Sequence, residues 1–146
     1  MNLKLTLTSL MAALSDELNR EIFIANSEGR YSLTFDDISV ELYQSHGWLV
    51  AESELEFDLA SGLNYQQEAA LEKVMQQALI NVRKNNAIVA INERNKLTLV
   101  QRVDSNVSAA SFISMINDQV DIAEKYQQLV QQHTLAGSNL NNVWLP

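Results

Sequence analysis

The chain has 146 residues and a mass of 16.4 kDa, which suits one domain and leaves no room for two independent cores. Its formal net charge of −8 argues against a nucleic-acid partner, because affinity for phosphate backbones depends on clustered Lys and Arg, and the ten basic residues here are scattered. Cysteine is absent, which excludes disulfides, thiol catalysis and Cys-based zinc sites. The composition predicts an acidic, helix-rich domain without redox chemistry.

The first predicted element is an amphipathic helix that begins near Asn2. Its apolar stripe consists of Leu3, Leu7, Leu10, Met11, Leu14 and Leu18. Asp16 and Glu17 on the polar face favour core packing over a membrane surface, which attracts Lys and Arg. No run of residues is apolar enough to cross a bilayer, and polar residues interrupt the N-terminal run where a signal peptide needs continuity. We therefore expect a cytoplasmic protein without membrane insertion.

After this helix the apolar period changes from 3.6 to 2. Residues 21–25 form a short apolar run that predicts an additional strand. Apolar and polar residues then alternate over 31–35, 38–42 and 48–57, as in half-buried strands. The connections between these three segments are short, and parallel strands need long crossovers, so the pattern predicts an antiparallel meander.

A second helix is predicted from Asn64, with Gln67 at the capping-box position, to Asn85. We expect its buried stripe to consist of Leu71, Val74, Met75, Ala78 and Val82. A hairpin follows, with strands at 87–91 and 96–103. The segment 88–91 is apolar on both faces, which is typical of a strand that is central in a sheet or covered by a partner.

The third helix is predicted to begin at Ser108 and to continue to about His133. Its apolar stripe is broad enough to be core alone or core together with an interface. The sequence therefore predicts one α+β domain over 1–133, in which helices pack against an antiparallel sheet. The predicted order of elements is helix, three strands, helix, two strands, helix. Residues 134–146 are uncharged and end in an apolar cluster, and we expect them to form a flexible tail.

Catalytic and metal-binding patterns are missing from the sequence. His46 and His133 have no acidic neighbour at metal-ligand spacing, so we expect both to be solvated. Glu52, Glu54 and Glu56 line one face of a predicted strand, which is typical of a solvated face; a hydrolase that uses this row remains only a formal alternative. We expect no enzyme activity, metal or cofactor. A domain of this size leaves much apolar surface uncovered, which indicates a binding module that self-associates.

Two segments resemble those of a known family, the class I type III secretion chaperones of the Tir-chaperone type. They are Ser32–Asp37 leading into Val40–Leu42, and the hairpin of Ala87–Ile91 with Leu97–Val103. The resemblance covers roughly 3–130 and rests on the order and spacing of the elements. It implies a cytoplasmic bacterial homodimer that holds the N-terminal segment of a secreted effector in extended form, and that contacts components of the secretion apparatus.

The resemblance also implies two sets of surface residues. The expected effector-binding residues are Leu5, Phe23, Ile24, Tyr31, Leu33 and Phe35, although each is equally compatible with a place in the core. The expected dimer residues are Val74, Met75, Ala78, Leu79, Ile88 and Val89. The alternative function is a small non-catalytic regulatory or accessory α+β domain that binds a ligand or protein permanently.

Overall fold

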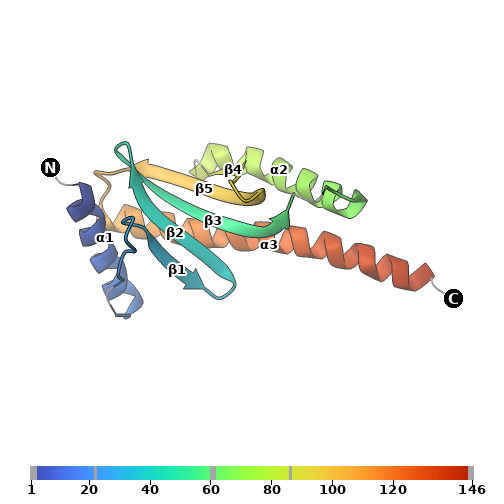
Figure 1. Ribbon diagram of the computed structural model, residues 1–146, viewed down its shortest axis with the longest axis horizontal. Coiled ribbons are helices and arrows are strands. Elements are labelled where there is room, and N and C mark those ends of the chain that lie inside the picture. Colours follow the sequence, from blue (N-terminus) through green and yellow to red (C-terminus); the bar gives the residue numbers. More distant parts are fainter. Residues whose placement is uncertain (1–2, 22, 60–61, 86, 145–146) are drawn as a thin grey trace.

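The residues described by the computed structural model form three helices and five strands in the predicted order (Figure 1). The elements are α1 (Leu3–Leu18), β1 (Tyr31–Phe35), β2 (Ile38–Ser45), β3 (Trp48–Asp58), α2 (Tyr65–Asn85), β4 (Ile88–Ile91), β5 (Lys96–Asp104) and α3 (Ala109–Trp144). The structure describes residues 3–21, 23–59, 62–85 and 87–144, without the side chains of 3–6, 83–85 and 132–144. The α+β class and the order of elements are confirmed.

Local capping explains where two of the helices begin. The Gln67 N–H donates to Asn64 Oδ1 at 2.8 Å, and the Asn64 N–H donates to Gln67 Oε1 at 3.0 Å, which is the reciprocal capping box expected before α2. The Ser111 N–H donates to Ser108 Oγ at 3.2 Å before α3. Such caps satisfy backbone donors that have no partner within the helix, and each contributes about 1 kcal/mol.

The five strands form one antiparallel sheet in the order β1-β2-β3-β5-β4. A two-residue turn joins β2 to β3, with His46 at φ 50° and Gly47 at φ 82°. Two consecutive positive φ values define the tight hairpin turn that matches strand twist, and this explains a glycine at the second position. His46 therefore has a structural position in this turn. The two apolar faces of β4 predicted either a central position in the sheet or a partner that covers the strand. Strand β4 lies at an edge of the sheet, so the prediction of a central position is wrong.

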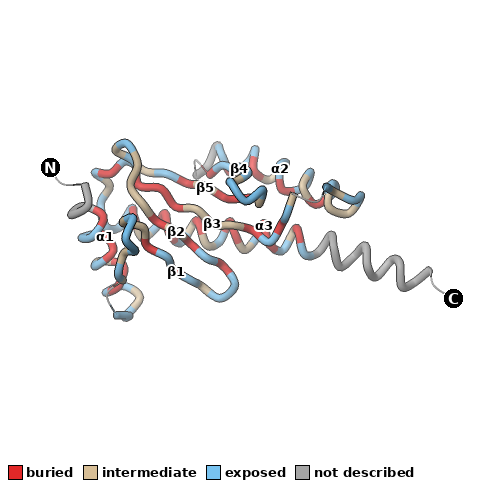
Figure 2. The backbone as a smooth tube through the Cα atoms, in the orientation of Figure 1, coloured by how far each residue is buried: buried red, intermediate tan, exposed pale blue. Residues whose placement is uncertain are grey.

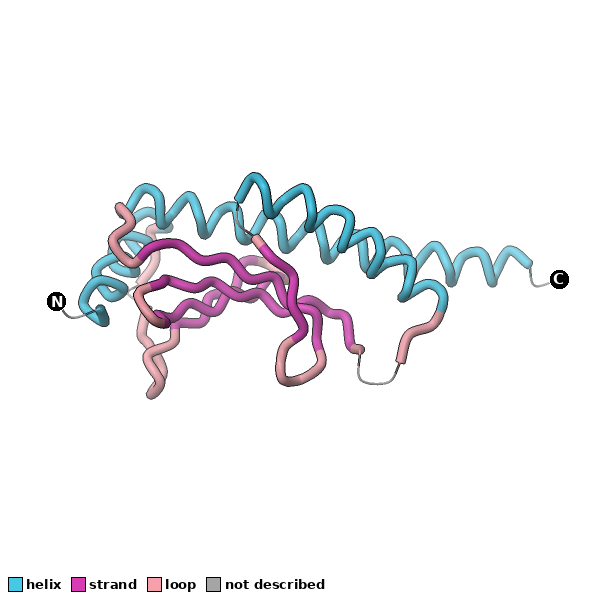
Figure 3. Tube along the Cα trace, turned by 90° about the horizontal axis from the view of Figure 1, so that it is seen from above, coloured by secondary structure: helices cyan, strands magenta, loops and turns pink. Residues whose placement is uncertain are grey.

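Helices α2 and α3 lie on one side of the sheet, and α1 lies beside one end of it (Figure 3). The long helix α3 contacts β2, β3 and β5, while α1 contacts β2 and the same helix. Helix α2 runs alongside α3 and contacts β4. In the described part of the chain, no helix covers the opposite face of the sheet, which we call the open face (Figure 3).

The core lies between the helices and the sheet, where the buried segments of α3 and of the central strands face one another (Figure 2). It also contains a polar network around Gln119, which is completely buried. Gln119 Nε2 donates to Ser53 Oγ at 3.0 Å and to the Leu99 carbonyl at 3.1 Å, and Gln119 Oε1 accepts from Gln101 Nε2 at 3.2 Å. Because a buried polar group without partners is costly, this network favours one register of α3 on the sheet.

Three further sequence predictions differ from the structure. Residues 21 and 23–25 form no strand. Helix α3 does not end near His133 but continues to Trp144, in agreement with the lack of proline in this stretch. On α2, Met75 and Val82 are exposed, so the buried stripe is narrower than expected.

Candidate functional site

The predicted effector-binding residues do not form one exposed surface. Tyr31 and Leu33 are buried in the core, and of the two only Tyr31 also lines the cleft described below. Phe23 and Phe35 are partly buried and pack against the core, whereas Ile24 is 89% exposed. The side chain of Leu5 lies outside the described residues. Phe23, Ile24 and Phe35 are the members of the set that a partner can reach.

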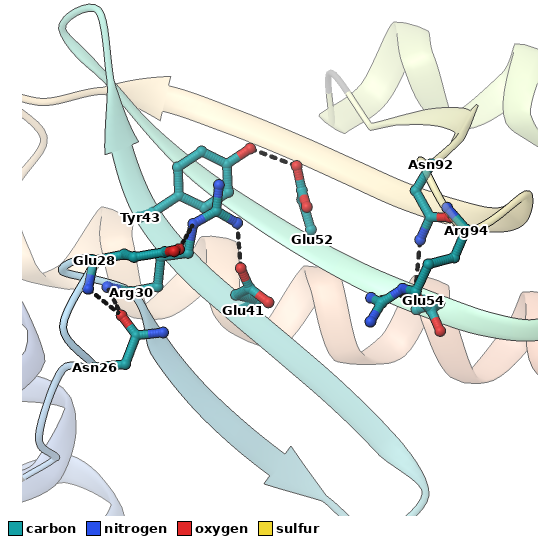
Figure 4. Close-up of polar contacts among 9 residues, drawn as sticks. All are labelled: Asn26, Glu28, Arg30, Glu41, Tyr43, Glu52, Glu54, Asn92 and Arg94. Atoms are coloured by element: carbon teal, nitrogen blue, oxygen red, sulfur yellow. Dashed lines mark hydrogen bonds and ion pairs between the residues drawn. The ribbon is translucent and has the colours of Figure 1, made fainter.

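A cleft of about 500 Å³ lies between α1 and the segment that leads into β1. It is lined by Leu7 and Thr8 of α1, by residues 25–31 and by Tyr43–Ser45 at the end of β2. The turn at its rim is closed by Asn26, whose Oδ1 accepts from the Glu28 and Arg30 backbone N–H groups at 2.9 and 3.0 Å. This turn positions the Arg30 side chain over the open face (Figure 4).

Arg30 joins the cleft to the carboxylates of the open face. Its guanidinium lies 4.1 Å from the centre of the Tyr43 ring and forms ion pairs with Glu41 and, at 3.9 Å, with Glu28 (Figure 4). The hydrogen bond to Glu41 raises the pKa of Arg30 above its ordinary value. The Tyr43 hydroxyl donates to Glu52, and burial followed by this hydrogen bond raises the pKa of Tyr43 to about 12.

A second exposed apolar area, which we call the α2–β4 surface, consists of Met75, Leu79 and Val82 on α2 and Ile88 on β4. The three helix residues share one face at spacings of four and three. Leu79 is 70% exposed and Ile88 is 48% exposed. Exposed apolar patches of this kind usually mark interaction sites.

The α2–β4 surface continues onto the open face of the sheet. Val82 and Ile88 line a hollow of about 620 Å³ together with the aromatic side chains Tyr43 and Trp48 and with Val50, Val100, Ser45 and Arg102. The Arg102 guanidinium lies 4.3 Å from the centre of the Trp48 ring. Cation–π stacking of this kind holds the exposed ring in place beside the hollow.

The predicted dimer residues divide into two groups. Met75, Leu79 and Ile88 are exposed and belong to the α2–β4 surface, whereas Val74 and Ala78 are buried within the chain. Val89 is partly buried and packs against the core. The first group can contact a second chain directly, whereas Val74 and Ala78 pack in the core of their own chain.

The carboxylate row of β3 lies on the open face, as its alternation predicts. Glu54 is neutralised by Arg94 at 2.6 Å and by Lys96 at 3.7 Å (Figure 4). Among the described residues, no cluster of three or more His, Cys, Asp or Glu side chains has a geometry that could hold a metal ion. No helix among them is long and apolar enough to span a membrane.

Sequence reasoning missed three residues that shape the open face, namely Tyr43, Trp48 and Arg30. The first two occupy outward positions in strands whose inward positions are apolar, so an aromatic residue out of phase with the alternation was the available signal. Arg30 had no comparable signal, because its contacts with Glu41 and Tyr43 depend on where β2 lies in the folded chain.

Comparison with known proteins places this fold in a family. No curated protein matches the chain in sequence. The solved structure of the ExsC–ExsE complex contains a chain with 18% identity and a TM-score of 0.71, covering 89% of this chain and 97% of that one. A chain of the HopA1–SchA chaperone–effector complex has 13% identity and a TM-score of 0.67, covering 86% and 95%.

The complex of the Yersinia pestis type III secretion chaperone SycH with a stable fragment of YscM2 matches at 21% identity and a TM-score of 0.60, covering 82% of this chain and 98% of that one. At these identities the likeness shows a shared fold. The family model described as "Tir chaperone protein (CesT) family" matches residues 9–127, which is most of the chain. The chain therefore belongs to the Tir chaperone protein family, as the resemblance of its sequence indicated.

Proposed function

We propose that this protein is a type III secretion chaperone that binds the N-terminal segment of a secreted effector in extended form and keeps it soluble and competent for secretion. The observation that carries the proposal is membership of the Tir chaperone protein family over residues 9–127. It is supported by the shared fold with chains from a chaperone–effector complex and from a complex of a type III secretion chaperone.

The best candidate for the client surface is the edge of the sheet at β1, together with the cleft beside it. Among the described residues, strand β1 pairs only with β2, so its other side offers backbone groups to an added strand. Phe35 ends this strand, and Phe23 and Ile24 precede the turn that leads into it; all three offer apolar contacts. An extended segment can therefore combine main-chain hydrogen bonds with apolar side-chain contacts, which is how strand addition gives affinity and specificity.

The α2–β4 surface is the best candidate for a homodimer interface. Strand β4 is apolar on both faces, although it lies at an edge of the sheet. A partner chain that covers the strand accounts for this composition, because the chain's own sheet does not enclose it. A second copy of the chain carries the same apolar surface, and a twofold arrangement buries both copies at once. A stable interface needs about 800 Å² from each partner, and the adjoining hollow on the open face extends the available area.

The role that we propose is non-catalytic and cytoplasmic. A client that is held extended must be handed to an export apparatus before it folds, so we also propose contacts with components of that apparatus. The acidic surface keeps the chaperone soluble while its apolar surfaces stay accessible.

Co-expression tests the proposal. The chain is produced with the N-terminal segment of an effector encoded beside it, and the soluble fraction is measured against the segment expressed alone. We expect the segment to become soluble and to co-purify without nucleotide. A segment that stays insoluble or fails to co-purify with any of several effectors would contradict the chaperone proposal and favour an accessory domain.

A further inference from the structure

Strands β2 and β3 separate halfway along the sheet. They pair from Ser45↔Trp48 to Glu41↔Glu52, and beyond Glu52 strand β3 continues to Asp58 without β2. Strand β2 instead follows β1 down to Ile38, and the two strands diverge in the ribbon view (Figure 1). The pairing of β3 with β5 is also irregular between Glu54 and Asp58. In the part of the chain that the structure describes, the separation leaves one side of β3 without a neighbouring strand over this stretch.

A notch of about 310 Å³ opens where the strands part. Its walls carry five carboxylates, which come from Asp37, Glu41, Glu52, Glu54 and Glu56. Two of these are neutralised within the chain, because Glu41 pairs with Arg30 and Glu54 pairs with Arg94 and Lys96. Among the described residues, Asp37, Glu52 and Glu56 form no ion pair, so the notch carries unbalanced negative charge.

Gln127 of α3 also lines the notch and gives a second, independent indication of a ligand. Gln127 is only 7% exposed. Its Oε1 accepts a hydrogen bond from the Glu56 backbone N–H at 3.0 Å, and it thereby replaces the carbonyl that a strand paired with this side of β3 would provide. Its Nε2 is buried and has no hydrogen-bond partner among the described residues. A buried amide donor without an acceptor is costly, and a main-chain carbonyl of an entering segment would satisfy it.

We propose that this notch binds an extended segment of a partner polypeptide that carries an arginine or lysine. The cationic side chain is matched by the free carboxylates of Asp37 and Glu56, and the main chain lies along the unpaired side of β3. The required ligand is thus both cationic and rich in carbonyl acceptors, which a basic peptide segment is and a free metal ion is not. The inference rests on the proposed function in one respect, since it takes the segment to be part of the client.

The test is a nuclear magnetic resonance titration of the full-length, ¹⁵N-labelled chain. The probe is the pentapeptide acetyl-Ala-Ser-Arg-Ser-Ala-amide, and the matched neutral probe carries citrulline in place of arginine. We expect saturable shifts of the Gln127 side-chain amide and of the Glu56 backbone amide with the arginine probe, and roughly fivefold weaker binding of the citrulline probe. Absence of saturable shifts at the notch, or equal binding of both probes, would overturn the inference.

A pair of charge-matched variants separates the notch from general electrostatics. The variant Asp37→Asn/Glu56→Gln removes two carboxylates from the notch, and Glu17→Gln/Asp121→Asn removes two exposed carboxylates from helices. All four side chains are exposed, so both variants should fold. We expect roughly fivefold weaker binding of the arginine probe for the first variant and no change for the second; equal effects would refute a specific notch.

These outcomes are distinct from those of the co-expression experiment. If a client co-purifies while the arginine probe leaves the notch unshifted, the notch inference fails and the chaperone proposal stands. If the probe binds the notch but no effector segment co-purifies, the chaperone proposal fails and the notch remains a site for basic segments.

Discussion

Replacing Leu79 with glutamate should dissociate the proposed homodimer without unfolding the chain. Leu79 is 70% exposed in the single chain, so the substitution leaves the core intact. Complete burial of a leucine contributes about 1.5–3 kcal/mol, and burial of the exposed part therefore about 1.5 kcal/mol. A twofold interface contains the residue twice, which gives about 3 kcal/mol, or roughly a hundredfold in the dissociation constant. Burial of two carboxylates adds to this loss.

Light scattering and sedimentation over a range of concentrations measure the dissociation constant, and circular dichroism checks the fold. Met75→Glu, on the same face of α2, should act in the same direction. Ile24→Glu is the matched control, because Ile24 is more exposed than Leu79, at 89%, but precedes β1 at the opposite edge of the sheet. An unchanged dimer in Leu79→Glu, or a wild-type mass near 16.4 kDa at micromolar concentration, would refute the assignment of this interface.

Three further predictions concern stability, pH and client binding. Tyr126→Phe should lower the free energy of unfolding by about 1–3 kcal/mol in chemical denaturation, because the buried Asn81 Nδ2 loses its acceptor at 2.7 Å; a loss below about 0.5 kcal/mol contradicts this. The pKa of Tyr43 is raised to about 12, so its stabilising contribution should be complete below pH 10 and lost as the pH rises through about 12. Glu52→Gln should lower this pKa in an ultraviolet absorbance titration, and an unchanged titration would show that the hydrogen bond does not cause the shift. Ile24→Asp should weaken co-purification of an effector segment at least about tenfold at unchanged dimer mass, and full co-purification would exclude this residue from the client surface.

Local patterns in the sequence predicted local structure well. The capping box of Asn64 and Gln67 placed the start of α2, and the alternation predicted over 48–57 agrees with the burial of Ala51 and Leu55 in β3. These features depend on neighbours within a few residues, and the physical preferences of such short segments survive in the folded chain.

Long-range features could not be predicted in this way. Periodicity identifies the apolar face of an element but not what covers it. Met75 was therefore expected both in the buried stripe of α2 and at a dimer interface, and it is exposed in the single chain. Tyr31 was equally compatible with a client surface and with the core, and it is buried. The edge position of β4 depends on the pairing of β5 with β3, which no local pattern encodes. In the sequence, Gln127 looks like an ordinary polar helix residue. It can accept a hydrogen bond from the Glu56 backbone only because β2 separates from β3 beyond Glu52.

The mass of a purified complex tests the central claim most directly. The chain is co-expressed with an effector's N-terminal segment, and native mass spectrometry measures the assembly. We predict a species that contains two copies of the 16.4 kDa chain and one client segment, with the client exchanging its amide hydrogens as an extended segment rather than as a folded domain. A chain that stays free of every effector segment offered, or that binds only a fully folded partner, would contradict the account.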